Sequence, residues 1–212
     1  MVDIGVSKSP AGNSVRVRVP PAVPPYSETL AYIVGVALGD GNLSNPNGRA
    51  TRLRITCDTR YPNVIHEIRT ALEILFPNNK VSLAQRMSTY LDISVYSNKL
   101  NEYLPWQVGL GPKKLQRARV PTWILNDADY ARACLRGLIQ TDGCIYTDRG
   151  YRMVNFTNDT AELAEDVSQM INSLGFKHSV YKLKRKDSTH KYTVRVSSRA
   201  KEFMELIGLT KT

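Results

Sequence analysis

The sequence contains few cysteines and no long apolar run. Its 212 residues include three cysteines, Cys57, Cys134 and Cys144. Their odd number and their spacing fit neither a zinc site nor a disulfide framework, so reduced thiols are expected. No apolar stretch reaches the roughly 18 residues of a membrane-spanning helix, and no secretory signal is visible. We therefore expect an intracellular protein, in cytoplasm, nucleoid or organelle, without a membrane partner.

Acidic residues are scarce relative to basic ones. Lys and Arg total 29 against 19 Asp and Glu, which gives a net charge of +10. This balance suits a polyanionic partner, although a merely basic protein has the same totals. Position favours nucleic acid, because residues 177–199 hold eight Lys and Arg side chains and one acid, Asp187.

What the sequence does contain is an internal repeat. Residues 32–41 (YIVGVALGDG) and 134–143 (CLRGLIQTDG) lie 102 positions apart. Each reads as an apolar helix that has an internal glycine and ends in Asp-Gly. An internal repeat of this kind indicates an architecture of two similar units.

The segments after each copy follow the same order. Helix and strand periodicity predicts α-β-β-α-β-β-α in each half, and hence an α+β fold of two pseudo-symmetric halves, each with a four-stranded antiparallel sheet. Expected helices span residues 28–39, 62–76, 99–106, 127–141, 160–174 and 200–207; placed strands span 52–56, 81–83, 91–95, 152–156, 180–186 and 191–196. Expected regions are an N-terminal extension (1–26, a tail or an ordered arm), a first half (27–112), a linker (113–126) and a second half (127–212).

Small residues recur at four-residue spacing in both repeated helices. They are Gly35 and Gly39 in the first helix, and Gly137 and Thr141 in the second. Glycine inside a helix costs about 1 kcal/mol relative to alanine, so its use in both copies indicates close packing. Small residues spaced in this way let two helix backbones approach. We expect the two helices to pack together and their terminal acids to emerge side by side.

Those acids, Asp40 and Asp142, are placed unfavourably. A helix C-terminus carries partial negative charge, and neighbouring carboxylates repel each other. One Asp-Gly would be read as a simple turn; two matched copies beside basic strands favour a metal site. Oxygen ligands suit Mg²⁺, and Mn²⁺ or Ca²⁺ can occupy the same sites. The predicted metal site comprises both acids with the preceding Gly39 and Thr141.

The two motifs resemble the paired LAGLIDADG sequences of single-chain, intron-encoded homing endonucleases. The resemblance covers about residues 27–211, and the order of elements in each half is also the family's. Leu38 and Gly39 depart from the Asp and Ala of the motif name. The matching residues are Gly35, Asp40, Gly41, Leu135, Gly137, Leu138, Ile139, Asp142 and Gly143.

The resemblance implies a function and two alternatives. It implies that each half presents a curved sheet to the major groove of double-stranded DNA. It also implies that the paired acids bind metal and hydrolyse both strands of a long, non-palindromic site, leaving short 3′ overhangs. One chain carries both acids, so a monomer suffices. The alternatives on the same fold are a maturase acting on intron RNA and a non-catalytic DNA-binding regulator.

The family also places a basic residue near each acid. Lys113 and Lys211 follow Gly-Leu at matched positions and are the nominees, with phosphate contact as an equal alternative to catalysis and Lys114 as a substitute for Lys113. The family further uses a polar residue after the first long strand to position water. Here the candidates are Cys57 or Asp58 in the first half and Phe156 or Thr157 in the second, which predicts an asymmetric solvent network.

DNA contacts are expected from basic strands, turns and the linker. Alternation along the strand 180–186 predicts a basic front formed by Lys182, Lys184 and Lys186, with Tyr181 and Leu183 behind. Sequence alone does not separate base contacts from phosphate contacts. The expected DNA-binding residues are Arg49, Arg52, Arg54, Arg86, Lys114, Arg117, Arg119, Arg149, Arg152, Lys182, Lys184, Lys186, Lys191, Thr193 and Arg195.

Overall fold

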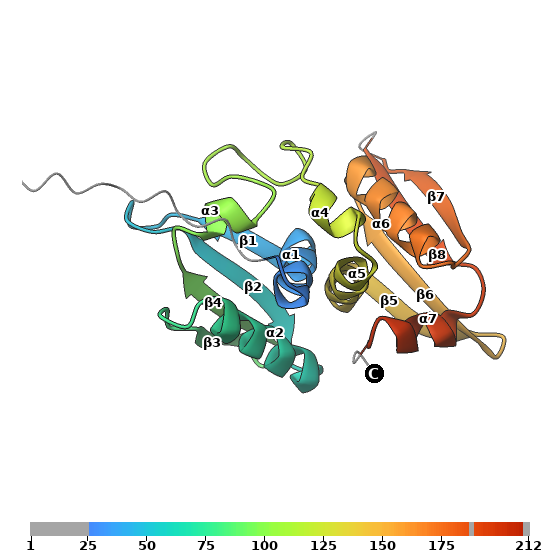
Figure 1. The fold of residues 1–212 in the computed structure, drawn as a ribbon, viewed down its shortest axis with the longest axis horizontal. Helices are drawn as coiled ribbons and strands as arrows, with labels where there is room; N and C mark the ends of the chain where they lie inside the picture. The colour runs from blue at the N-terminus through green and yellow to red at the C-terminus, as the bar shows by residue number, and fades with distance from the viewer. Residues whose placement is uncertain (1–25, 187–188, 210–212) are drawn as a thin grey trace, which may run out of the picture.

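Two four-stranded antiparallel sheets flank a central pair of helices (Figure 1). The computed structural model describes residues 26–186 and 189–209. The first half contains α1 (Glu28–Asp40), β1 (Gly41–Ser44), β2 (Arg52–Asp58), α2 (Pro62–Leu75), β3 (Ser82–Met87), β4 (Tyr90–Tyr96) and α3 (Leu100–Tyr103). The second contains α4 (Thr122–Leu125), α5 (Ala128–Asp142), β5 (Gly143–Asp148), β6 (Tyr151–Asn158), α6 (Ala161–Ser173), β7 (His178–Lys184), β8 (His190–Val196) and α7 (Ala200–Leu206).

This architecture confirms the predicted α+β fold. The strand orders are β1-β2-β4-β3 and β5-β6-β8-β7, so the second sheet repeats the first. In Figure 1, α2 and α6 lie at opposite corners of the molecule, as do α3 and α7, which is the arrangement of an approximate two-fold axis through the central helices. The sequence did not predict α4, and it implied β1 and β5 without placing them. Lys211 and nearly all of the expected N-terminal extension lie outside the described residues.

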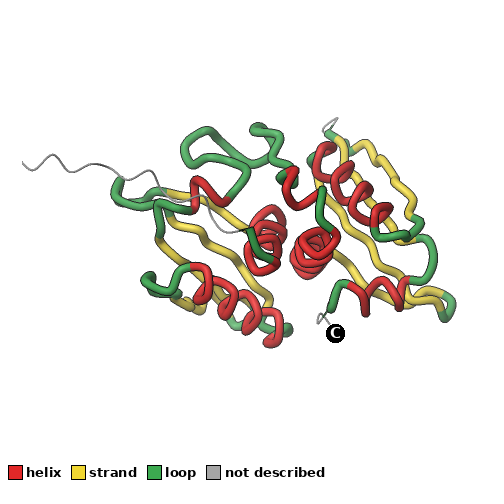
Figure 2. Tube along the Cα trace, in the orientation of Figure 1, coloured by secondary structure: helices red, strands yellow, loops and turns green. Residues whose placement is uncertain are grey.

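The two motif helices pack against each other, as their small residues predicted. Figure 2 shows α1 and α5 side by side between the sheets. A Cβ atom added at Gly137 would lie 2.5 Å from the carbonyl oxygen of Tyr32, and one added at Gly35 would collide with the carbonyl oxygen of Cys134. Only glycine allows this approach. Every residue of α1 from Leu30 to Leu38 is buried, as a helix that is apolar on all sides requires.

Each sheet has one face covered by helices and one open face. Leu53 and Ile55 of β2 and Val154 and Phe156 of β6 are completely buried on the covered faces. Their alternating neighbours point to the open faces and are partly or fully exposed. The open faces therefore carry the polar side chains that are available to a partner.

The expected faces of β7 are reversed in the structure. Tyr181 lies opposite Thr193 and Leu183 opposite Lys191, so these apolar side chains share the open face. Lys182 instead lies opposite Tyr192 on the covered side, and its ammonium group is 5.7 Å from that ring. Alternation identifies which residues share a face, but not which face is inside. At the sheet edge the covering is incomplete, because Val180, which lies on the covered side opposite Val194, is 51% exposed.

Among the described residues, no helix combines the length and the apolar character needed to cross a bilayer.

Candidate functional site

Asp40 and Asp142 are the last residues of α1 and α5. The glycine after each acid lets the chain pass directly from the helix into an extended strand. A Cβ at Gly41 would lie 2.6 Å from the Cα of Ala37, so a larger residue would collide with the last helical turn. Neither helix has a basic residue in its last turn. The last turns of the two helices therefore supply no basic side chain to offset the acids.

Each acid lines a hollow that is completed by the helix of the other half. The Asp142 hollow, about 390 Å³, includes Leu38 and Gly39 of α1. The Asp40 hollow, about 220 Å³, includes Gln140 and Thr141 of α5. A Cβ at Gly39 would lie 3.6 Å from Asp142 Cγ. Each carboxylate therefore lies next to the last turn of the motif helix from the other half.

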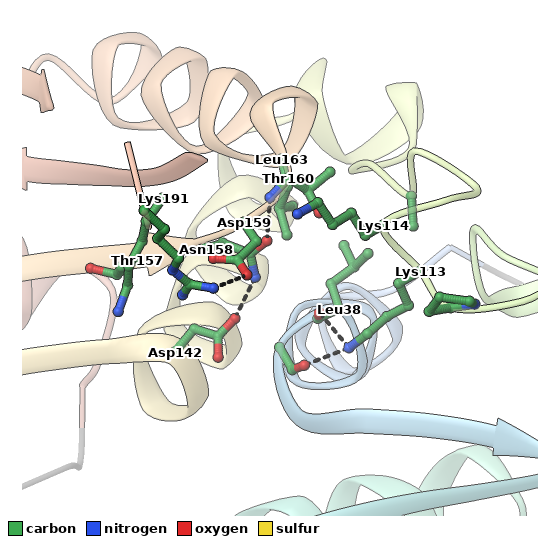
Figure 3. Close-up of a pocket in the computed structure, with 14 residues that line it drawn as sticks. Leu38, Lys113, Lys114, Asp142, Thr157, Asn158, Asp159, Thr160, Leu163 and Lys191 are labelled. Carbon is green, nitrogen blue, oxygen red and sulfur yellow. Dashed lines mark hydrogen bonds and ion pairs between the residues drawn. The ribbon is translucent and has the colours of Figure 1, made fainter. Parts of the chain in front are cut away.

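Lys113 supplies part of the missing compensation. Figure 3 shows its side chain reaching the end of α1, where Nζ donates hydrogen bonds to the carbonyl oxygens of Ala37 (3.0 Å), Leu38 (2.6 Å) and Gly39. Burial lowers the pKa of Lys113 to about 8, against the charges of Asp142 and Asp40, which raise it. The structure therefore places this predicted residue at the site, bonded to the helix end. Its predicted counterpart, Lys211, is not among the described residues.

Asn158 orients the second acid. It is the last residue of β6, and its Nδ2 donates a 2.7 Å hydrogen bond to Asp142 Oδ2. Its own Oδ1 accepts a hydrogen bond of 2.9 Å from the backbone N–H of Thr160, which fixes the amide (Figure 3). Asn158 was not among the candidate site residues expected from the sequence.

Asn158 was missed because the two halves were aligned incorrectly after the first long strand of each. Gly41 lies opposite Ile55 and Gly143 opposite Phe156, so Phe156 is the counterpart of Ile55 and is fully buried. The predicted match of Phe156 or Thr157 with Cys57 or Asp58 is therefore wrong. The offset between halves is 101 from Ile55 to Phe156 but 99 from Pro62 to Ala161, because the strand-to-helix connection is longer in the first half.

The corrected counterpart of Asn158 is Cys57. Cys57 lines the Asp40 hollow but is only 7% exposed. Burial, followed by the charges of Asp40 and Asp92, raises the pKa of this thiol to about 12. A neutral thiol is a weak hydrogen-bond donor. The predicted asymmetry between the halves is present, but it lies between an amide and a thiol.

A buried polar cluster adds to the asymmetry behind Asp40. Tyr32 Oη donates a 2.7 Å hydrogen bond to Gln140 Oε1, and Gln140 Nε2 donates one of 2.8 Å to Glu67 Oε2 in α2. Arg136 Nε lies 2.9 Å from Glu67 Oε1. Burial, together with the charge of Glu67, raises the pKa of Tyr32, which keeps its hydroxyl protonated. The corresponding residue beside Asp142 is the apolar Leu38.

The expected DNA-binding residues fall into distinct places. Arg52, Arg54 and Arg86 lie on the open face of the first sheet, and Lys191, Thr193 and Arg195 on that of the second. Lys114 lines the Asp142 hollow, and Arg49, Arg149 and Lys186 are in exposed turns. The other five residues lie away from the open faces. Three of them are on the covered side of the second sheet: Arg152, Lys182 and Lys184. The linker residues Arg117 and Arg119 form ion pairs with Glu162 and Asp166, respectively.

The last of these pairs has a structural role. Asp166 in α6 is fully buried, and it accepts hydrogen bonds from Arg119 Nη2 at 2.5 Å and from the backbone N–H of Val120 at 2.7 Å. An unpaired buried carboxylate would be costly, so Arg119 anchors the linker to the second half.

The donor set fits a hard divalent cation held mainly by two carboxylates. The described residues contain no cluster of three or more His, Cys, Asp or Glu side chains that could form an all-protein metal site. Mg²⁺ commonly binds through one or two carboxylates and keeps water in its shell. Of the other predicted ligands, the Gly39 carbonyl already accepts a hydrogen bond from Lys113, and the Thr141 hydroxyl donates to the Gly137 carbonyl at 2.9 Å. Each of these oxygens has a further lone pair, so Gly39 and Thr141 remain predicted ligands beside Asp40 and Asp142, the carboxylates that would hold the metal.

Comparison with known families assigns both halves. Residues 129–208 match the model of the LAGLIDADG-like domain, and residues 29–96 match that of the WhiA LAGLIDADG-like domain. Each matched region contains one of the two acids. The chain belongs to the LAGLIDADG family.

Solved LAGLIDADG structures share the whole arrangement. Variants of the homing endonuclease I-DmoI superpose with a TM-score of 0.62 at 22% identity, over 85% of this chain and 94% of theirs. I-DmoI in complex with DNA and Mn gives 0.61 at 20% identity, over 87% and 97%. The N-terminal LAGLIDADG domain of DUF199/WhiA gives 0.59 at 12% identity, over 86% and 83%. At these identities the likeness establishes the fold alone.

A curated relative is much longer than this chain. The tRNA-splicing ligase RtcB of Pyrococcus abyssi (strain GE5 / Orsay) is 27% identical over 210 residues, which cover 87% of this chain. The chain spans 22% of that protein's length. The ligase activity of the whole relative is therefore not carried over to the LAGLIDADG chain described here.

Proposed function

We propose that this protein is a site-specific endonuclease that hydrolyses both strands of a long, non-palindromic double-stranded DNA site with a divalent metal, leaving short 3′ overhangs. One observation carries the proposal. Asp40 and Asp142 end two helices that are in contact through glycine, each beside a hollow completed by the other half. A divalent cation bound by both acids would offset their charge at the negative helix ends.

Different residues of the chain bind the metal, orient the carboxylate, balance the charge and bind the DNA. Asp40 and Asp142 hold the cation, and Asn158 fixes the orientation of the second carboxylate. A divalent ion bound there lowers the pKa of water and stabilises the leaving oxygen of a phosphodiester. Lys113 balances charge at the end of α1. The open faces, with their arginines and Lys191, bind the DNA, and the proposed monomer needs no second copy because one chain has both acids.

Three features support this reading over a non-catalytic regulator, and an assay separates it from a maturase on the same fold. Both acids are present, both hollows are open to solvent, and an amide is aimed at one carboxylate. The complexes of I-DmoI with DNA in the presence of Mn or Mg concern that protein, and they make the same partner and metal reasonable here. The likeness to the WhiA domain shows that the fold alone does not decide between them.

The test is selection of cleaved sequences from a random duplex library with Mg²⁺, followed by kinetics on the recovered site. Asp40→Asn and Asp142→Asn should each lower double-strand cleavage by at least about 1,000-fold, equivalent to about 4 kcal/mol, since each removes a metal ligand. Asp129→Asn, at the opposite end of α5 and paired with Arg132, is the matched control and should cleave normally. Specific binding without cleavage by the unaltered chain would instead support a non-catalytic regulator.

A further inference from the structure

A buried carboxylate links three strands on the open face of the first sheet. Asp92 in β4 is 3% exposed, whereas Tyr90, two residues away on the same face, is 47% exposed. Asp92 Oδ1 accepts a 2.8 Å hydrogen bond from Thr56 Oγ1 in β2. Asp92 Oδ2 accepts one of 2.6 Å from Arg86 Nε in β3, and it lies 3.9 Å from Arg54 Nε in β2.

The strand register brings both arginines to this acid. Asp92 lies directly opposite Thr56 on β2, so Arg54 is its diagonal neighbour, within reach of a long side chain. On β3, Gln85 lies opposite Leu91 and Met87 opposite Tyr90, which leaves Arg86 as the extra residue of a β-bulge. A bulge redirects the side chain that it contains. The acid and both arginines therefore meet through backbone geometry, not through flexible surface chains.

Nε is the nitrogen of each guanidinium group that lies nearest Asp92: Arg86 Nε donates a hydrogen bond to it, and Arg54 Nε forms an ion pair at 3.9 Å without a hydrogen bond. The side chains of Arg54 and Arg86 are 35% and 56% exposed. Within the described part of the chain, the terminal nitrogens of both groups donate no hydrogen bond to protein. Burial raises the pKa of the Asp92 carboxyl, but the hydrogen bonds from Arg86 and Thr56 and the charge of Arg54 outweigh it and lower the pKa overall, so the group stays ionised.

The second sheet has no such acid. Thr193 occupies the position of Asp92, opposite Thr157, and the two hydroxyl groups are 3.2 Å apart. The open-face arginine there, Arg195, is held by the neutral amide of Asn155 at 3.1 Å and lies over the ring of Tyr181. Among the residues that the structure describes, an acid in contact with two open-face arginines is therefore found in the first half alone.

We propose that Asp92 is a positioning residue for base recognition, holding Arg54 and Arg86 so that their terminal nitrogens contact guanine edges in the half-site bound by the first sheet. The inference rests on the proposed DNA function. Arginine recognises guanine with two parallel N–H donors, which requires a fixed plane. A carboxylate beneath a DNA-binding face weakens phosphate attraction, and its benefit is reduced rotamer freedom of the arginines on binding.

The experiment is a binding selection from a random duplex library, with the full chain in EDTA so that bound DNA is recovered intact. Asp92→Asn keeps the shape of the side chain and removes its charge. Guanine preference should fall about ten-fold at positions in one half-site and stay unchanged in the other. Glu73→Gln, which removes the exposed partner of Arg69 on α2, is the control for net charge and should leave the sequence profile intact.

A second variant tests the same proposal in case Asp92→Asn fails to fold. Arg86→Lys alters a half-exposed side chain, retains its charge and loses the planar fork. It should reduce guanine preference at a subset of the same positions. Full guanine preference in both variants, or an equal loss across both half-sites, would overturn the role of Asp92. No preferred sequence with the unaltered chain would instead overturn the proposed function itself.

Discussion

The hollows around Asp40 and Asp142 have the same framework and different linings. In each, an acid ends a central helix, and the last turn of the opposite helix forms one wall. Beside Asp142 stand the amide of Asn158 and the apolar Leu38; beside Asp40 stand the buried thiol of Cys57 and the hydrogen-bonded Gln140. The backbone repeat preserves the position of each carboxylate. The side chains around it decide how firmly that carboxylate is held.

The sheets differ in the same way. In the first sheet an ionised, buried acid accepts a hydrogen bond from Arg86 and pairs with Arg54, whereas in the second an amide and an aromatic ring contact Arg195. Charge-assisted hydrogen bonds are about twice as strong as neutral ones. We therefore expect the first half to discriminate more sharply among sequences, and the second to tolerate more variation.

The largest loss of stability is expected where the halves meet. In Gly137→Leu, the new Cβ would lie 2.5 Å from the Tyr32 carbonyl oxygen and 2.7 Å from Val36 N. Backbone atoms cannot yield without separating the helices, so the free energy of unfolding should fall by at least about 3 kcal/mol. Urea denaturation followed by circular dichroism measures it.

Gly48→Leu is the control for this change. Gly48 has open space around it and a φ of +66°, so its substitution should cost only the backbone strain of about 1–2 kcal/mol. Equal losses in the two variants would show that the seam does not depend on close helix contact.

A smaller effect is expected from the amide that distinguishes the hollows. Asn158→Ala removes the hydrogen bond to Asp142 and should slow cleavage of one DNA strand about ten-fold, the equivalent of about 1.4 kcal/mol. Cys57→Ala, at the matched position, should change either strand rate less than two-fold. Duplexes labelled on each strand report the two rates separately. If Asn158→Ala slowed both strands equally, the hollows would not act independently.

The smallest effect concerns Lys113 in the metal-free protein. Its pKa is about 8 in the fold against 10.5 as the ordinary value in the unfolded chain. The unfolded state therefore binds the proton more tightly, and the contribution of Lys113 to the free energy of unfolding rises with pH in this range. From pH 7.5 to 8.5 the free energy of unfolding of the unaltered chain should rise by about 0.7 kcal/mol relative to that of Lys113→Met. Urea denaturation of both proteins in EDTA at pH 7.5 and pH 8.5 measures this difference. A fall in the relative free energy of unfolding with pH would contradict the lowering of the Lys113 pKa by burial.

Much of the framework could be predicted because it follows local rules. Ser27 caps α1 by accepting a hydrogen bond from the Leu30 N–H, as its residue type predicts. Asp127 caps α5 in the same way. Apolar periodicity located the long helices, and the small residues located their contact. These signals lie within a few residues of one another along the chain.

The parts that could not be predicted depend on pairing between distant segments. Asn158 meets Asp142 only because β6 pairs with β5 in one register, and a shift of two residues hid it from a comparison of the halves. Asp92 is an ordinary strand acid in the sequence, and its role depends on a bulge in a neighbouring strand. The outward direction of Tyr181 depends on which side of β7 the helices cover.

The sequence by itself determined the two halves, the paired helices and the acids at their ends, because these follow from helix periodicity, capping and the size of glycine. The tertiary structure decided which side chains surround each acid and which arginines are held in place. Those relations are set by strand register, where moving the pairing by one residue sends every side chain to the opposite face.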